Sequence, residues 1–97
     1  MAKADFISPN SKLAASSDMQ NGAIAARDLC LAIEKLNKAA IEKSGEVDVE
    51  GVAALLKTSL EQQQAETRDG FLLALAEFMA LALDGCVVIP SRWKPLT

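Results

Sequence analysis

The sequence contains no histidine and no tyrosine. Their absence removes the commonest general base, the commonest zinc ligand and a frequent catalytic acid. The sequence also lacks a glycine-rich loop of the kind that binds phosphate groups. We therefore expect that the protein is not an enzyme, and we predict no catalytic residue, no cofactor and no cofactor-binding residue.

Cysteine is scarce, and neither Cys30 nor Cys86 has an adjacent basic residue that would lower the pKa of its thiol. Both are expected to be buried, reduced thiols rather than nucleophiles. Two isolated cysteines do not reveal their pairing, so a disulfide between them stays open. The amino terminus lacks the charged and then apolar pattern of a secretory signal, and we expect a cytoplasmic protein.

One acidic segment has the spacing of part of a calcium-binding loop. Residues 46–51 place acids at the first, third and fifth positions and Gly51 at the sixth. The twelfth position of such a loop needs a bidentate glutamate, but Lys57 occupies it and its positive charge opposes cation binding. We predict no metal site, and we interpret Asp48 as the residue that caps the amino end of a helix.

Basic charge and long apolar runs are also missing. The net charge of −3 leaves no basic stripe to bind a phosphate backbone, so nucleic acid is not an expected partner. The apolar run from Phe71 to Pro90 is interrupted by Glu77, Asp84 and Gly85. No stretch approaches the roughly 20 apolar residues that a membrane span needs, and a membrane is not an expected partner either.

The composition that remains favours helices. Hydrophobic residues make up 51% of the 97 residues but aromatic residues only 4%, a balance rich in alanine and leucine. We predict an all-α protein with a flexible amino-terminal arm over residues 1–16 and a single helical domain over residues 17–97. Helices are predicted at about residues 17–43, 48–66 and 69–84.

The connection between the first two predicted helices is short. Ser44 and Gly45 end the first helix, Asp48 begins the second, and a turn of this length predicts an antiparallel helical hairpin. Gly22 is expected to weaken the start of the first helix.

The boundary between the second and third predicted helices is less definite. The apolar pattern lapses from Gln63 to Thr67, and Gly70 can loosen a helix, so a break is the preferred prediction. One continuous helix over residues 48–84 stays open, because no proline interrupts the chain there.

The last predicted helix is very apolar, since Glu77 is the only polar side chain between Phe71 and Leu83. At 100° per residue, a core face is predicted to comprise Phe71, Leu72, Leu75, Phe78, Met79 and Leu83. Leu73 and Leu81 lie four residues either side of Glu77 and share its stripe on the opposite side. A small chain has little to cover this stripe, so we predict that a second copy, in a helical dimer, or an obligate protein partner buries it.

An extended carboxy-terminal tail is predicted to pack along the helices. Trp93 lies between two cations there, and it is expected to anchor the tail on the protein's own helices, on a second copy or on another molecule. A buried Glu77 would need a basic group from the partner chain. The predicted partner-binding residues are Leu73, Glu77, Leu81, Arg92, Trp93 and Lys94.

These features predict a small cytoplasmic protein–protein interaction module that acts through an apolar helical surface, as an adaptor, assembly factor, inhibitor or regulator. The alternative is a peripheral membrane-associated protein that inserts the apolar last helix and the Arg92-Trp93-Lys94 tail at the interface.

Overall fold

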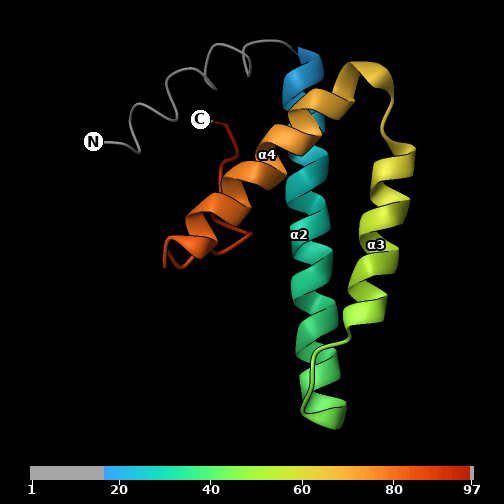
Figure 1. Cartoon of the computed structure of the whole chain (residues 1–97), viewed down its shortest axis with the longest axis vertical. Coiled ribbons are helices and arrows are strands. Elements are labelled where there is room, and N and C mark those ends of the chain that lie inside the picture. Colours follow the sequence, from blue (N-terminus) through green and yellow to red (C-terminus); the bar gives the residue numbers. More distant parts are fainter. Residues whose placement is uncertain (1–16, 97) are drawn as a thin grey trace.

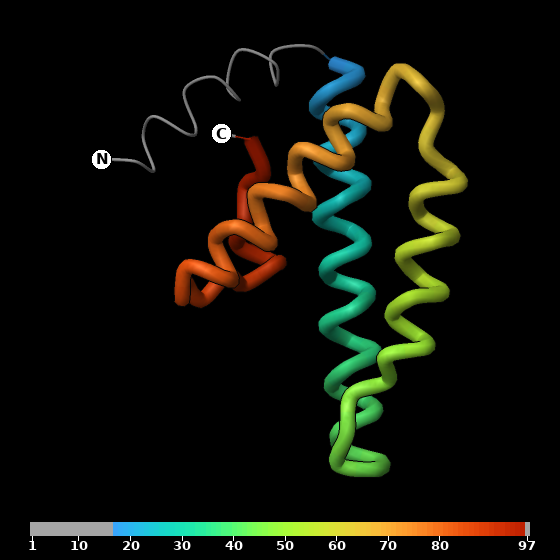
Figure 2. The backbone as a smooth tube through the Cα atoms, viewed as in Figure 1, coloured from blue at the N-terminus to red at the C-terminus, as the bar shows by residue number. Residues whose placement is uncertain are grey.

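The computed structural model describes residues 17–96, and within this range the chain is all-helical. Its helices are α2 (Ser17–Ser44), α3 (Val49–Gln62) and α4 (Ala65–Leu83). The all-α prediction is therefore confirmed, while the predicted amino-terminal arm lies outside the described residues. α3 runs back alongside α2, and α4 crosses α2 near the amino end of α2 (Figure 1). The C-terminal segment, residues 84–96, turns back beneath α4 (Figure 2).

Short-range interactions set the turn between α2 and α3. Gly45 has a φ of 80°, and its backbone N–H donates to the carbonyl of Ile41 at 2.8 Å. This left-handed conformation favours glycine and ends α2 where the sequence predicts. Asp48 Oδ1 then accepts a hydrogen bond from the N–H of Gly51 at 2.9 Å, which confirms it as the N-cap of α3.

The chain breaks between α3 and α4 at Gln63 and Gln64. Both residues are extended, with ψ values of 130° and 165°. The Thr67 hydroxyl donates to the side-chain carbonyl of Gln63 at 2.9 Å across this break. A continuous helix over residues 48–84 is therefore not formed, and α4 begins at Ala65, four residues before the predicted start at about residue 69.

Gly22 and Gly70 bring the backbones of α2 and α4 into contact. A Cβ atom on Gly22 would lie 2.6 Å from the backbone nitrogen of Phe71 and would also meet the carbonyl oxygen of Thr67. A Cβ atom on Gly70 would lie 2.8 Å from the carbonyl carbon of Met19. The sequence suggested that both glycines weaken helices, whereas the structure uses them to let the helices cross without intervening side chains.

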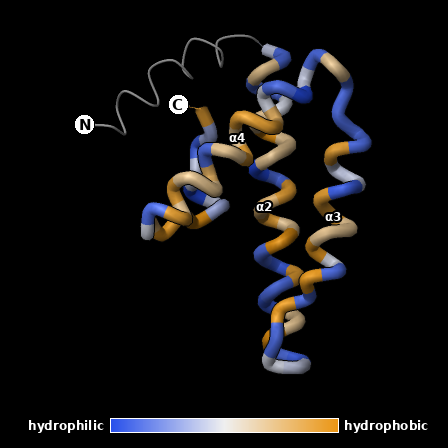
Figure 3. Tube along the Cα trace, viewed as in Figure 1, coloured by the Kyte–Doolittle hydropathy of each residue, from blue (hydrophilic) through white to orange (hydrophobic). Residues whose placement is uncertain are grey.

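The core lies between α2, α4 and the C-terminal segment. Its buried apolar residues are Ala23, Ala26, Leu29, Cys30, Phe71, Ala74, Trp93 and Leu96. α3 contributes no fully buried residue, because it packs mainly on α2 and no further helix within residues 17–96 covers its other side. Most of α4 is hydrophobic (Figure 3), yet only one of its faces reaches this core. The opposite face of α4 is therefore not covered by residues 17–96 of the same chain.

Candidate functional site

The inner face of α4 carries a buried carboxylate. Glu77 is only 3% exposed. Its Oε1 accepts two hydrogen bonds from the C-terminal segment, one from the indole Nε1–H of Trp93 at 2.8 Å and one from the backbone N–H of Leu96 at 3.2 Å. Two donors from the same chain therefore take the place of the basic group that the sequence analysis expected from a partner.

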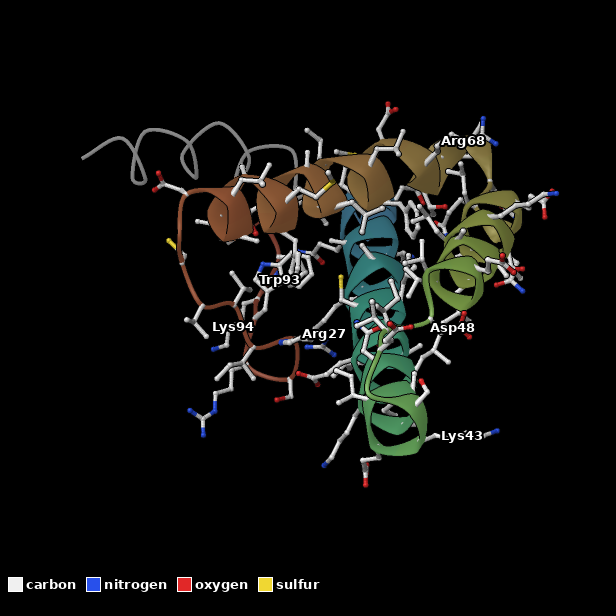
Figure 4. All side chains as sticks on the ribbon, turned by 60° about the horizontal axis from the view of Figure 1, so that its bottom comes forward. Arg27, Lys43, Asp48, Arg68, Trp93 and Lys94 are labelled. Carbon is white, nitrogen blue, oxygen red and sulfur yellow. The ribbon has the colours of Figure 1, made fainter. Side chains whose placement is uncertain are left out.

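Trp93 and Leu96 hold the C-terminal segment against the helices. The Trp93 ring meets Phe78 edge to face, with ring centroids 5.1 Å apart. Trp93 lies between α4 and α2 in Figure 4. Leu96 is fully buried and has a φ of 62°, a strained conformation for a leucine that its contacts in the core maintain. Trp93 thus packs on the protein's own helices, one of the alternatives that the sequence left open.

The six predicted partner-binding residues do not form one surface. Glu77 and Trp93 are buried and joined by a hydrogen bond. Leu73 and Leu81 are half-buried, whereas Arg92 and Lys94 are exposed. The assignment of Glu77 to an uncovered stripe is therefore wrong. A partner contact by the others stays a prediction.

The exposed face of α4 is formed by other residues, which we call the outer stripe: Leu72, Ala76, Met79, Ala80 and Leu83. Its three large side chains, Leu72, Met79 and Leu83, are 47%, 60% and 85% exposed. The sequence predicted these three side chains on the core face of the helix, and that prediction is wrong. The helix is turned so that Glu77 reaches the two donors of the C-terminal segment, and Met79 and Leu83 consequently face outward.

No sequence signal identified this rotation. Between Phe71 and Leu83 every residue but Glu77 is apolar, so the pattern does not mark one side as the core. The hydrogen bond that holds Glu77 inward comes from Trp93, 16 residues further along the chain and outside α4. The periodicity of the helix therefore could not reveal it. The one related feature of the sequence is Trp93 itself, because a buried indole N–H needs a hydrogen-bond acceptor.

A hollow marks the amino-terminal end of the outer stripe. It has a volume of about 510 Å³ and is lined by Met19, Asp69, Leu72, Leu73 and Ala76. Met19 belongs to the first turns of α2, so the hollow lies beside the crossing of α2 and α4. The outer stripe therefore combines a convex apolar ridge with a depression that could receive a side chain.

Acidic residues flank the outer stripe at both ends. Asp69 lies one turn before Leu72, and Asp84 follows Leu83; both are exposed. The last turn of α4 has no basic residue, so the negative end of its dipole adds to the charge of Asp84. The guanidinium of Arg68 donates to the carbonyl of Gln63 at 3.4 Å, toward the α3–α4 junction, where Figure 4 also shows it.

Neither cysteine forms a disulfide. Cys30 is buried in the core, and burial raises the pKa of its thiol from 9.0 to about 11. The thiolate is the reactive form, so Cys30 is suited to packing rather than chemistry.

This pKa predicts selective labelling. With Cys86 changed to serine, we expect the remaining thiol to react with Ellman's reagent at pH 8 many times more slowly in native protein than in urea. The folded state holds the Cys30 proton more tightly than the unfolded chain, so its contribution to stability is complete below pH 9 and is lost as the pH rises toward 11. Equal rates in native buffer and in urea would contradict this placement of Cys30.

Within residues 17–96, no helix has the length and hydropathy to span a bilayer. Nor does that part of the chain bring together three or more side chains that could ligate a metal ion. Comparisons with protein-family models, curated proteins and solved structures found no match for this chain.

Proposed function

We propose that this protein is a small cytoplasmic protein–protein interaction module, an adaptor, assembly factor, inhibitor or regulator that binds another polypeptide through the outer stripe of α4. The observation that carries the proposal is the exposure of Leu72, Met79 and Leu83 on one helical face, with only alanines between them. Single exposed apolar side chains are common on protein surfaces, but a contiguous apolar face marks an interaction site.

The energy available at this face is appreciable. Burying one large apolar side chain contributes roughly 1.5 to 3 kcal/mol, so the three half-exposed or mostly exposed side chains could together contribute several kcal/mol to binding. Association also has an entropic cost, so only part of this energy would appear as affinity. Both a second copy and a different protein are compatible with the apolar face alone, and the charged residues beside that face distinguish them.

The test is a set of matched variants. Wild-type protein, a Leu72→Ser, Met79→Ser, Leu83→Ser variant and a control, Ile41→Ser with Val49→Ser, would be compared by light scattering and by co-purification from the native cell. The control removes apolar side chains that are 50% and 70% exposed at the opposite end of α2 and at the start of α3. We expect only the outer-stripe variant to lose self-association or a co-purified protein. Identical behaviour of all three would contradict the proposal.

A peripheral membrane role is the second candidate. Val87 is 89% exposed and follows Leu83 by four residues, and the exposed Arg92 and Lys94 belong to the same C-terminal segment as Val87. Sedimentation with vesicles containing anionic lipid measures it directly. Loss of vesicle binding in an Arg92→Gln, Lys94→Gln variant would support this role, and absence of wild-type protein from the vesicle pellet would exclude it.

A further inference from the structure

We propose that the partner of the outer stripe is an amphipathic helix of a different protein, with basic residues at both ends of its apolar face. This inference rests on the proposed function and specifies its partner class. It follows from the charges around the stripe, from the length of the stripe and from the hollow beside Met19.

The length of the stripe defines the size of the partner helix. Leu72, Ala76, Met79 and Leu83 are spaced by four, three and four residues, which keeps them on one face. At about 1.5 Å per residue, Leu72 and Leu83 lie about 16 Å apart along the helix axis, and Asp69 and Asp84 about 22 Å. A partner helix of about four turns covers this distance.

The acidic residues at the two ends of the outer stripe favour basic residues at the two ends of the partner helix. Asp69 lines the hollow at one end, and Asp84 stands beside the negative pole of α4 at the other. An acidic residue at a helix carboxyl end is repelled by the negative end of the helix dipole, so Asp84 lowers rather than raises the stability of α4 through that dipole. Lysine or arginine at each end of a partner helix would meet opposite charge in either orientation.

The same charges disfavour a second copy. If two α4 helices packed in parallel, Asp69 would face Asp69 and Asp84 would face Asp84. If they packed antiparallel, Asp69 of one copy would approach Asp84 of the other. Both arrangements bring like charges together at both ends of the contact, a cost that a basic partner avoids.

The hollow supplies the position for an anchor. Leu72, Leu73 and Ala76 form its apolar side, and Asp69 lies at its edge. A large apolar side chain of the partner would enter it, one turn away from a basic residue that pairs with Asp69, in the manner of a helix bound in a groove.

Two synthetic helical peptides test this inference on the full chain. Both carry the same leucine and alanine face over four turns, but one has lysines at both ends and the other glutamates. Methyl NMR of the full-length protein would follow Met79 during titration. We expect the basic peptide to bind at least about tenfold more tightly, with a preference that shrinks as salt rises.

Charge variants locate the preference. An Asp69→Asn, Asp84→Asn variant should lose most of the discrimination between the two peptides. A control with Glu42→Gln and Glu46→Gln has the same net charge but alters exposed residues at the far end of α2, and it should keep the preference. Equal binding of the two peptides by wild-type protein, or equal loss in both variants, would overturn the inference.

The outcomes separate this inference from the proposed function. Equal binding of both peptides that disappears in the Leu72→Ser, Met79→Ser, Leu83→Ser variant would overturn the basic partner and leave the interaction face standing. A dimer that dissociates in that same variant would identify a second copy as the occupant. Binding only after Phe6, Ile7 and Leu13 are changed to serine would identify the chain's own amino-terminal residues as the occupant. Each of the last two results would overturn the inference.

Discussion

Replacing Trp93 with alanine is expected to lower the free energy of unfolding by about 3 to 5 kcal/mol, because the change removes a large buried side chain. Trp93 is 7% exposed, contacts Phe78 and donates to Glu77. Its loss leaves a cavity at the junction of α2, α4 and the C-terminal segment, and it removes one of two donors from a buried carboxylate. Urea unfolding followed by circular dichroism at 222 nm measures the change.

Two comparisons isolate the hydrogen bond to Glu77. Trp93→Phe keeps an aromatic ring beside Phe78 but loses the indole N–H, so we expect a smaller loss of about 1.5 to 3 kcal/mol. Arg92→Ala alters the exposed neighbour and should change stability by no more than about 0.5 kcal/mol. If Trp93→Ala were no more destabilising than Arg92→Ala, the C-terminal segment would not be held as described.

Gly22→Ala and Gly70→Ala are each expected to destabilise the protein by about 1 to 3 kcal/mol through overpacking. The added methyl group would collide with backbone atoms of the other helix, which cannot move without separating α2 from α4. Helix propensity alone predicts the opposite sign, a stabilisation of about 1 kcal/mol. The sign of the change, measured by thermal and urea unfolding, therefore distinguishes a backbone contact from a weak position in a helix.

Gly51→Ala is the matched comparison. A Cβ atom at Gly51 would meet the side chains of Asp48 and Leu36 rather than backbone. These side chains can adjust, and the gain in helix propensity offsets the cost, so we expect a change smaller than at either crossing glycine. A stabilising effect at Gly22 and Gly70 equal to that at Gly51 would contradict the close crossing.

Features that depend on neighbouring residues could be predicted from the sequence. The all-α class follows from composition, the end of α2 from Gly45, and the start of α3 from Asp48. Gly85, with a φ of 84°, follows the end of α4, which the sequence predicted at about residue 84, and the N–H of Cys86 donates to the carbonyl of Leu81 at 3.0 Å. Each of these rests on contacts within about five residues, which local sequence patterns describe well.

Features that depend on distant residues could not be predicted in this way. Gly22 and Gly70 look like weak helix positions in the sequence. Only the structure shows that their lack of a side chain lets the backbones of α2 and α4 come into contact. Glu77 looks like a surface residue because it is the only charged residue between Phe71 and Leu83. Its hydrogen bonds with Trp93 and Leu96 hold it on the inner face of α4. The sequence consequently predicted an exposed apolar face around Glu77, whereas the most exposed apolar side chains of α4 are those of Leu72, Met79 and Leu83.

The orientation of α4 can be measured most directly by methyl NMR with a soluble paramagnetic agent, at a concentration where light scattering gives the mass of one copy. We predict strong relaxation of the Met79 and Leu83 methyl groups and protection of Leu29 and Leu96, which are 3% and 0% exposed. Protection of Met79 and Leu83 equal to that of Leu29 and Leu96 would contradict the outward placement of the outer stripe and the interaction proposed for it.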